Sequence, residues 1–203
     1  MIAIINHGLG NFRSVYSAVE SLNHKAVVTD DKSEIKKCEK IIIPGVGNFK
    51  YAMNNLRSYK LIDTLNNEVL VKNKPFMGIC LGCQLLFEYS EEDKETKGLN
   101  WIDGKVNSFN KNKNFPVTHV GWNEIKINDD PIFYKIPNNF MMYFNHSYFP
   151  VLKDKKLELG NTNYSKKFSS IFKKKNIYGI QGHPEKSQKY GIMLLKNFLN
   201  NVS

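Results

Sequence analysis

Residues 75–88 read Pro-Phe-Met-Gly-Ile-Cys-Leu-Gly-Cys-Gln-Leu-Leu-Phe-Glu, and the architecture of the chain follows from them. They predict a short buried strand, a sharp turn that carries Cys80, and a helix with an apolar face. Gly78, Cys80 and Gly82 have the spacing of a nucleophile elbow, in which glycines let strand and helix approach closely while one side chain projects. The pattern therefore presents a thiol, and Leu81 begins a helix whose N-terminus lies beside it.

The thiol needs help from other residues before it can act as a nucleophile. An ordinary thiol is only about 3% ionised at neutral pH, so a helix N-terminus and a base are required beside it. Two other interpretations stay open: Cys80 is a small buried apolar residue, or it forms a redox Cys-x-x-Cys pair with Cys83. The elbow explains both glycines and the redox motif explains neither. The glycines therefore favour a nucleophile.

The length and composition indicate one domain that spans residues 1–203. A chain of 203 residues with 41% hydrophobic content can bury one core but is short for two domains. Cys38, Cys80 and Cys83 form no disulfide framework, and the apolar run at residues 1–6 is too short for a signal peptide. No apolar run approaches the length that spans a membrane. We therefore expect a reduced, cytoplasmic protein with no membrane association.

The formal net charge of +10 raises the question of nucleic-acid binding. The lysines are scattered, however, and the densest groups lie in turn-like segments with no DNA- or RNA-binding motif nearby. This distribution favours a solvated basic face, or a docking surface for an acidic partner. We expect no nucleic-acid partner.

The first half of the chain has the pattern of βαβ units. Strands are predicted at residues 1–6, 26–29 and 40–43, helices at 12–22 and across 49–71, and a break at 30–33. The glycine-rich turn at residues 44–48 ends a buried parallel strand, so its backbone N–H groups point into the crevice beyond the strand ends. Such groups could stabilise an oxyanion formed at Cys80, although a tight turn that only caps the next helix is equally compatible.

Beyond about residue 98 the pattern changes to short strands between turn residues, which favours antiparallel pairs. Before that point, the acidic run at residues 90–95 is interpreted as a solvated helix end. Strands are predicted at residues 102–109, 124–127, 141–148, 171–172 and 176–181, and a closing helix at 190–199. The fold class is therefore α/β: an open, mostly parallel sheet with flanking helices, and an antiparallel β-rich portion in the second half.

A base for Cys80 is available near the end of the chain. His183 and Glu185 are two residues apart, so in an extended chain both side chains leave the same face, about 7 Å apart at the backbone. Pro184 favours extension at His183. Because functional residues in open α/β sheets gather at the carboxyl ends of strands, Cys80, His183 and Glu185 are expected to form a Cys-His-Glu triad. Alternatively, His183 is an ordinary satisfied histidine, as is expected of His7, His24, His119 and His146.

These segments resemble the class I (triad) glutamine amidotransferases, whose fold has a flavodoxin-like core. The resemblance rests on residues 78–87 together with Gln181, His183, Pro184, Glu185, Lys186 and Ser187. Further signatures at 10–11, 44–49, 119–123 and 146–148 resemble the HisH type, the glutaminase subunit of imidazole glycerol phosphate synthase. The resemblance covers nearly the whole chain.

The resemblance implies the chemistry of the site. Cys80 would attack the side-chain amide of L-glutamine, His183 would pass the proton to the departing ammonia, and Glu185 would hold His183. The backbone N–H groups of Val46 and Leu81 would bind the oxyanion, and in the family the first of these can point the wrong way until the synthase is occupied. Water would then hydrolyse the glutamyl thioester to glutamate.

The resemblance also implies residues for binding and for assembly. The positions that hold the amino-acid end of glutamine match Gln84, Glu92, Ser147 and Tyr148. Ammonia would pass to a (β/α)8-barrel cyclase, HisF, in a heterodimer that makes imidazole glycerol phosphate and an aminoimidazole carboxamide ribotide (AICAR) for histidine biosynthesis. Interface positions match Asn11, Trp122, Tyr143 and Lys186. No cofactor is implied, and no metal-ligand spacing is present.

Three departures from the family pattern leave the acceptor open. Gly182 stands where Phe is common, His7 where Tyr is more usual, and Thr118 where Pro commonly precedes the His119 motif. One alternative is a paralogous glutaminase that supplies ammonia to another synthase, such as one that aminates sugars for surface glycans. Two others are a non-catalytic binding module and a cysteine hydrolase or isomerase with an unrelated substrate.

Overall fold

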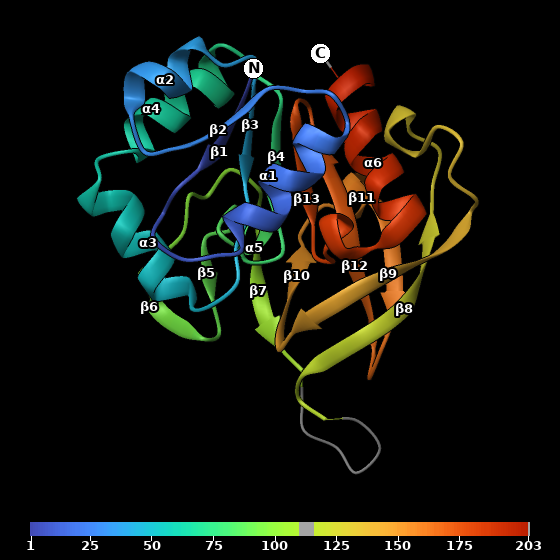
Figure 1. Cartoon of the computed structure of the whole chain (residues 1–203). Helices are drawn as coiled ribbons and strands as arrows, with labels where there is room; N and C mark the ends of the chain where they lie inside the picture. The colour runs from blue at the N-terminus through green and yellow to red at the C-terminus, as the bar shows by residue number, and fades with distance from the viewer. Residues whose placement is uncertain (110–115, 203) are drawn as a thin grey trace.

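The structure, a computed structural model, describes residues 1–109 and 116–202. Within these residues the strands form a large sheet in the order β2-β1-β3-β4-β13-β12-β11-β8-β9 and a small one in the order β10-β7-β5-β6 (Figure 1). The strands are β1 (Ile2–Ile5), β2 (Ala26–Thr29), β3 (Lys40–Ile43), β4 (Phe76–Ile79), β5 (Tyr89–Ser90), β6 (Asp93–Lys97), β7 (Gly104–Ser108), β8 (His119–Ile127), β9 (Asn139–His146), β10 (Tyr148–Leu152), β11 (Glu158–Asn163), β12 (Lys167–Lys174) and β13 (Ile177–Ile180).

Helices cover both faces of the large sheet. They are α1 (Phe12–Ser21), α2 (Lys32–Lys37), α3 (Phe49–Ser58), α4 (Ile62–Asn66), α5 (Leu81–Gln84) and α6 (Gln188–Asn201), with a π-helical turn at Asn67–Val71 and 3-10 turns at Pro131–Phe133, Lys155–Leu157 and Pro184–Lys186. Side chains alternate along β1: Ile2 and Ile4 pack in the core under α1 and α6, while Ala3 and Ile5 pack in the core under α3 and α4. Each strand of this region therefore contributes to two cores.

The parallel half of the large sheet brings the two ends of the chain together. The order β2-β1-β3-β4 continues with β13, and β13 pairs in parallel with β4 in a register that places Ile79 opposite Ile180. This is the strand order of flavodoxin-like folds. The carboxyl ends of β3, β4 and β13 consequently lie side by side.

The other half of the large sheet is antiparallel. Strand β12 pairs antiparallel with β13 and β11, and β8 pairs antiparallel with β11 and β9. The predicted α/β class with an antiparallel second half is confirmed, but the large sheet is mixed in equal parts and is not mostly parallel. The small sheet packs near α3 and α5 and holds the segment between the elbow and residue 108.

Three local predictions are wrong. The helix after Cys80 is the single turn α5, because the carbonyls of Leu85 and Leu86 accept hydrogen bonds from Leu99, Trp101 and Ile102 instead of from a continuing helix.

The acidic run is not a helix end. It forms β5, a turn and β6, and the backbone of Glu91 pairs with Val106 of β7.

The strand predicted at residues 141–148 is divided at Ser147 into β9 and β10, which belong to different sheets.

Two elements were not expected. Helix α2 replaces the predicted break, since Asp31 caps it by accepting hydrogen bonds from the N–H groups of Ser33 and Glu34. Strand β11 has a polar sequence but lies between β12 and β8. In the described part of the chain, no helix is both long and apolar enough to cross a membrane.

Candidate active site

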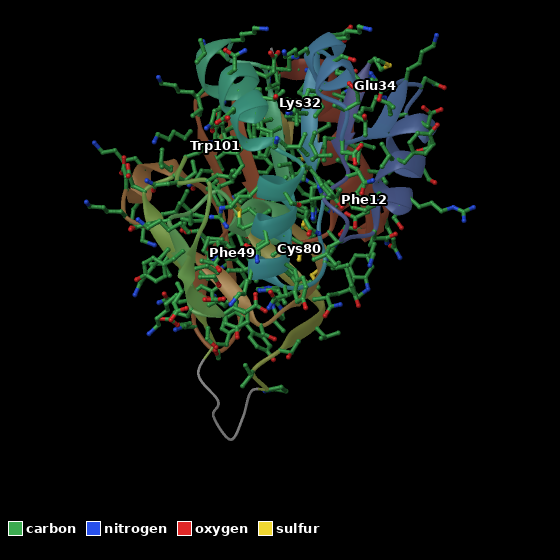
Figure 2. The ribbon with its side chains drawn as sticks, turned by 90° about the vertical axis from the view of Figure 1, so that its left-hand side faces the viewer. Phe12, Lys32, Glu34, Phe49, Cys80 and Trp101 are labelled. Carbon is green, nitrogen blue, oxygen red and sulfur yellow. The ribbon has the colours of Figure 1, made fainter. Side chains whose placement is uncertain are left out.

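Cys80 lies at the turn between β4 and α5, near the middle of the ribbon in Figure 2. Its φ is +51°, a conformation that non-glycine residues rarely adopt, and its backbone N–H donates to the Ile180 carbonyl at 2.8 Å. A Cβ added at Gly82 would lie 1.9 Å from the Ile43 carbonyl oxygen, and one at Gly78 would lie 2.6 Å from the Gly82 oxygen. Both glycines are therefore required by close backbone approach, as in an elbow.

Cys80 and Cys83 differ in environment. Cys80 lines a pocket of about 230 Å³, whereas Cys83 is fully buried under it. Burial raises the pKa of the Cys83 thiol well above its ordinary value, with the neighbouring Cys80 as a second cause. Both thiols are free, as is that of Cys38. This arrangement favours Cys80 as the reactive group and gives no support to a Cys80–Cys83 redox pair.

His183 and Glu185 meet through a turn and not along an extended strand. His183 Nδ1 lies 2.9 Å from Glu185 Oε1, and both side chains are only 2% exposed. His183 lies outside the helical region, with φ −111° and ψ 88°, but the chain does not stay extended, because Pro184–Lys186 form a 3-10 turn that folds the carboxylate back onto the ring. Pro184 occupies the first position of this turn, where its missing N–H is not needed.

The His183 ring also interacts with Cys80. Its Nε2 is buried and has no hydrogen-bond partner among the described residues. Burial alone would lower the pKa of His183, but its interactions with Cys80 and with Glu185 outweigh burial and raise the pKa to about 10. An imidazolium beside the Cys80 sulfur follows from this environment.

The pocket in front of Cys80 brings together the residues expected to hold glutamine. Besides Cys80 it is lined by Val46, Gly47, Leu81, Gln84, Glu92, Thr118, Asn145, His146, Ser147 and Tyr148. Glu92 Oε2 accepts a hydrogen bond from the Phe49 N–H at the start of α3, at 2.8 Å, so the β5–β6 turn is fixed to that helix. The Ser147 hydroxyl lies 2.9 Å from that of Thr118. All six non-triad residues expected to bind substrate or oxyanion therefore face one cavity.

The backbone at the expected oxyanion site is occupied by a protein group. The Leu81 N–H donates to the Gly45 carbonyl at 3.2 Å, and a Cβ at Gly45 would lie 2.8 Å from Leu81 Cβ. His7, buried under this turn, places Nε2 2.7 Å from the Pro44 carbonyl oxygen. The Leu81 donor becomes available to an oxyanion only when the Gly45 carbonyl turns away.

Gln181 belongs to the motif that carries His183, but the sequence alone assigned it no role. Its side-chain Nε2 lies 3.8 Å from the Cys80 sulfur, and the Asn145 carbonyl lies 3.9 Å from the same sulfur. Alternation with His183 at the end of a strand was a signal for Gln181, because residues two apart leave a strand on the same side. No sequence signal identified Asn145 or Thr118.

Three of the four expected interface residues gather beside His183. The ring of Trp122, which is 44% exposed, meets Tyr143 edge-on at 6.2 Å, and Lys186 Nζ lies 5.9 Å from the centre of the Tyr143 ring. Tyr143 in turn lies 6.2 Å from the His183 ring. Asn11 is separate: it caps α1 and lines a hollow of about 460 Å³ that also contains Glu185.

The side chain of Met142 fills the space next to Gly182. A Cβ at Gly182 would lie 2.3 Å from Met142 Sδ and 2.7 Å from Met142 Cγ. Met142 is fully buried on β9, so it fills the space next to the segment that carries His183. The loss of a side chain at position 182 therefore leaves no cavity.

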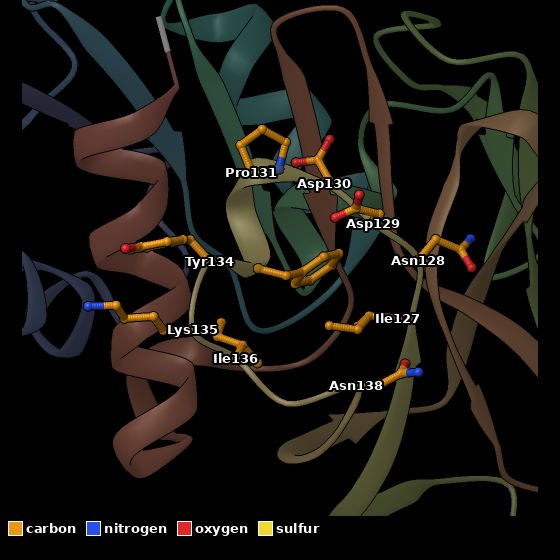
Figure 3. Close-up of a pocket in the computed structure, with 10 residues that line it drawn as sticks. Ile127, Asn128, Asp129, Asp130, Pro131, Tyr134, Lys135, Ile136 and Asn138 are labelled. Atoms are coloured by element: carbon orange, nitrogen blue, oxygen red, sulfur yellow. The ribbon is translucent and has the colours of Figure 1, made fainter.

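A larger hollow lies away from Cys80. It has a volume of about 590 Å³, follows the connection from β8 to β9 and includes Asp129, Asp130 and Tyr134 (Figure 3). Asp130 is already paired with Lys173 at 3.0 Å. Among the residues that the structure describes, no three His, Cys, Asp or Glu side chains are grouped to hold a metal ion. The pocket at Cys80 is therefore the better candidate for chemistry.

Comparisons with known proteins agree with this site. Residues 3–202 match the family model "Glutamine amidotransferase class-I". The chain is 42% identical over 200 residues to "Imidazole glycerol phosphate synthase subunit HisH 2" of Methanococcus maripaludis, covering 98% of each chain. It is 44% identical over 203 residues to HisH 1 of the same organism, again covering 98% of each.

The likeness extends to solved structures. The structure titled PurLQS, from Thermotoga maritima, superposes with a TM-score of 0.74 at 19% identity, covering all of this chain and 98% of that one, which shows a shared fold. With a family model that spans almost the whole sequence and full-length relatives above 40% identity, the chain belongs to the class I glutamine amidotransferase family.

Proposed function

We propose that this chain is the glutaminase subunit of imidazole glycerol phosphate synthase, acting in the cytoplasm. The observation that carries the proposal is the pocket in which Cys80 meets the buried His183–Glu185 pair. The HisH names of full-length relatives supply the identity of the synthase.

In the proposed reaction the Cys80 sulfur attacks the side-chain carbonyl carbon of glutamine. The carbonyl electrons move onto oxygen, and the oxyanion is bound by the N–H groups of Leu81 and Val46. His183 gives its proton to the amide nitrogen, the C–N bond breaks and ammonia leaves. Water then attacks the thioester carbonyl while His183 takes its proton, and the C–S bond breaks to release glutamate and the thiolate.

Other residues of the pocket would orient the substrate. Gln84, Glu92, Ser147 and Tyr148 offer donors and acceptors that suit the charged amino-acid end of glutamine. Glu92 carries the charge that would pair with the ammonium group of glutamine.

The ammonia would pass to a HisF-type (β/α)8 barrel, which we propose as the partner in a heterodimer. Support comes from the group formed by the exposed Trp122 and Lys186 with the half-buried Tyr143, which lies next to His183 and combines aromatic rings with a cation. Aromatic residues such as Trp122 and Tyr143 are enriched at the centres of protein interfaces. Asn11 would contribute from the far side of Glu185.

Glutamate release from glutamine tests the proposed nucleophile. With the barrel partner and its substrate present, Cys80→Ala should reduce the rate by about 10³-fold or more, because no thioester can form. Cys38→Ala is the matched control, since Cys38 is equally buried but lies in the core under α3 and α4 and does not line the pocket. Equal rates for wild type and Cys80→Ala would refute the proposal.

A second candidate function is to supply ammonia to a different synthase. Methanococcus maripaludis carries two HisH proteins that are similarly close to this chain, and Gly182, His7 and Thr118 depart from the family pattern. Complementation of a histidine auxotroph that has a competent cyclase but lacks its glutaminase separates the two. Growth supports the histidine pathway, and failure by a glutaminase-active chain supports a paralogous synthase.

A further inference from the structure

Gln181 lies directly beside the nucleophile because of strand register. Ile79 of β4 is opposite Ile180 of β13, and the Cys80 N–H continues the ladder by donating to the Ile180 carbonyl at 2.8 Å. The next residues on the two strands, Cys80 and Gln181, are therefore neighbours. The Gln181 side chain is completely buried, so each of its polar atoms must find a partner within the protein.

The side chain of Gln181 bridges three groups. Its Nε2 donates to Cys80 Sγ at 3.8 Å. Its Oε1 accepts from Gln84 Nε2 at 3.1 Å and from Cys83 Sγ at 3.8 Å. Both ends of the amide are thus used, and only the nitrogen faces the reactive sulfur.

The direction of this amide is fixed by the groups behind it. The Tyr148 carbonyl can only accept, and it receives hydrogen bonds from Gln84 Nε2 at 2.9 Å and from His146 Nδ1 at 2.7 Å. The Gln84 NH₂ group must face Tyr148, because only its nitrogen can donate to that carbonyl. The same NH₂ group faces Gln181, so the Gln181 atom that it meets must be the acceptor, Oε1. The Gln181 NH₂ is consequently turned toward Cys80 and cannot flip without loss of two hydrogen bonds.

We propose that Gln181 is a further catalytic residue, an uncharged donor that binds the Cys80 sulfur as a thiolate. The inference rests on the proposed role of Cys80 as nucleophile. An N–H group stabilises an anionic sulfur more than a neutral one, since hydrogen bonds to charged acceptors are the stronger kind. The donor contributes most when the thiolate is regenerated: as the C–S bond of the thioester breaks, the electron pair moves onto sulfur opposite the Gln181 N–H.

Cys83 and Gln84 act through Gln181 as positioning residues. Each donates to Oε1, which polarises the amide and strengthens its N–H as a donor. The raised pKa of Cys83 keeps its thiol protonated, so it remains a donor over the working pH range. This gives the second cysteine of the Cys-x-x-Cys sequence a part that needs no redox chemistry.

Other titratable groups also face the sulfur and must be left in place by any test. Among the described residues they are His183, supported by Glu185, on the turn after β13; His146 at the end of β9; Tyr148 at the start of β10; Cys83 on α5; and Glu92 across the pocket. A substitution at position 181 removes none of these groups, although it takes from the Cys83 thiol the oxygen to which it donates. Its effect on Cys80 is therefore specific to the amide.

The test is the pH dependence of Cys80 alkylation by iodoacetamide in the free subunit, with the Cys80 peptide quantified by mass spectrometry. Gln181→Met keeps the length of the side chain but removes the donor. We expect the midpoint of the profile to rise by about one pH unit, which lowers the rate about tenfold below the midpoint and leaves the high-pH plateau unchanged. Gln181→Glu, similar in shape but able to carry a negative charge, should raise the midpoint at least as far.

The matched control is Ser170→Ala on β12. Ser170 is fully buried and accepts a hydrogen bond from Thr162 at 2.9 Å, so its loss perturbs the neighbouring strand without touching the sulfur. Its midpoint should equal that of wild type. Identical midpoints for wild type and folded Gln181 variants, or a change in the plateau alone, would overturn the inference. Alkylation needs neither glutamine nor a partner, so this outcome is independent of whether the chain hydrolyses glutamine.

Discussion

Gly182 shows how one residue without a side chain is accommodated next to the proposed base. Met142 from β9 occupies the space where a Cβ would be, with Sδ 2.3 Å from that position. Methionine suits this task because it is unbranched and fills irregular gaps. The backbone N–H of His183 donates to the Tyr143 carbonyl at 2.8 Å, so the same part of β9 also holds the segment that carries the ring.

We expect Gly182→Phe to destabilise the protein by about 1–3 kcal/mol, because the new ring overlaps Met142 in a closed core. Met142→Ala alone should also destabilise it, by about 2–5 kcal/mol, since it leaves a cavity. The double variant should be more stable than the sum of the two changes predicts, by about 1 kcal/mol or more. Urea unfolding of all four proteins measures this coupling.

The double-mutant cycle contains its own control, because each single variant reports the cost of its own change. Additive effects would mean that Met142 does not substitute for the side chain missing at position 182. Glutaminase activity of the same proteins, with the partner present, reports whether the backbone of His183 has moved.

Among the elements, the turn between β3 and α3 sets the state of the proposed oxyanion site. The Gly45 carbonyl accepts the Leu81 N–H, and the His7 ring holds the adjacent Pro44 carbonyl at 2.7 Å. Burial lowers the pKa of His7, so the ring is neutral near pH 7 and donates a single N–H to that carbonyl. The hydrogen bond therefore stabilises the conformation in which Leu81 is unavailable.

We predict that His7→Phe raises the glutaminase activity of the free subunit. Loss of one hydrogen bond, worth about 1 kcal/mol, would shift the turn toward the open conformation by about fivefold. The rate in the complete complex should change much less, because the partner would already favour the open turn. Glutamate release with and without the partner measures both. His24→Phe, at a position that is not buried, is the control, and an unchanged ratio of the two rates for His7→Phe would contradict the prediction.

A helix or strand could be predicted from the sequence when its own side chains favour that secondary structure. The strands at residues 26–29 and 40–43 match the predicted bounds, because both are rich in β-branched residues, and Ile41–Ile43 are also fully buried. Strand β11, with the sequence Glu-Leu-Gly-Asn-Thr-Asn, has no such signal. It is a strand because β12 and β8 pair with it on either side, which is information from the rest of the fold.

The residues of the candidate site could be predicted from the sequence, but their exact geometry could not. Residue types and spacing identified Cys80, His183 and Glu185 as chemically suited to one another, and the structure brings them together. The 3-10 turn at Pro184–Lys186 and the hydrogen bond from Leu81 to Gly45 depend on φ and ψ at single residues, which periodicity does not encode. The contact between Gln181 and Cys80 depends on the register of β4 and β13, which spans about half of the chain.

For the molecule as a whole, buried histidines couple the fold to pH. His119 Nδ1 and His146 Nε2 lie 3.1 Å apart between β8 and β9, and both side chains are nearly inaccessible. Burial lowers the pKa of His119 to about 4 and that of His146 to about 3, the latter opposed by its hydrogen bond to the Tyr148 carbonyl. In the unfolded chain both would titrate near pH 6.5.

We predict that the free energy of unfolding falls as the pH is lowered from 7 to 5. In this range the unfolded chain binds protons at His119 and His146 and the folded chain does not, so stability is lost with decreasing pH. The two residues together account for about 4 kcal/mol over these two pH units. The carboxylates with lowered pKa values, Asp31, Glu68 and Asp93, lose their contribution only at lower pH, below the ordinary carboxyl range.

Urea unfolding at pH 7, 6 and 5 measures this dependence, and His119→Phe separates it from other acid effects. The variant should be less stable at pH 7, because His146 Nε2 loses its donor, yet its stability should fall less steeply with pH, by about half of the predicted loss. His24→Gln, at a position that is not buried, should keep the full slope. If the free energy of unfolding fell equally steeply with pH in wild type and in His119→Phe, the prediction would be wrong. His119 and His146 would then take up no extra protons on unfolding, because they would already carry charge in the native state.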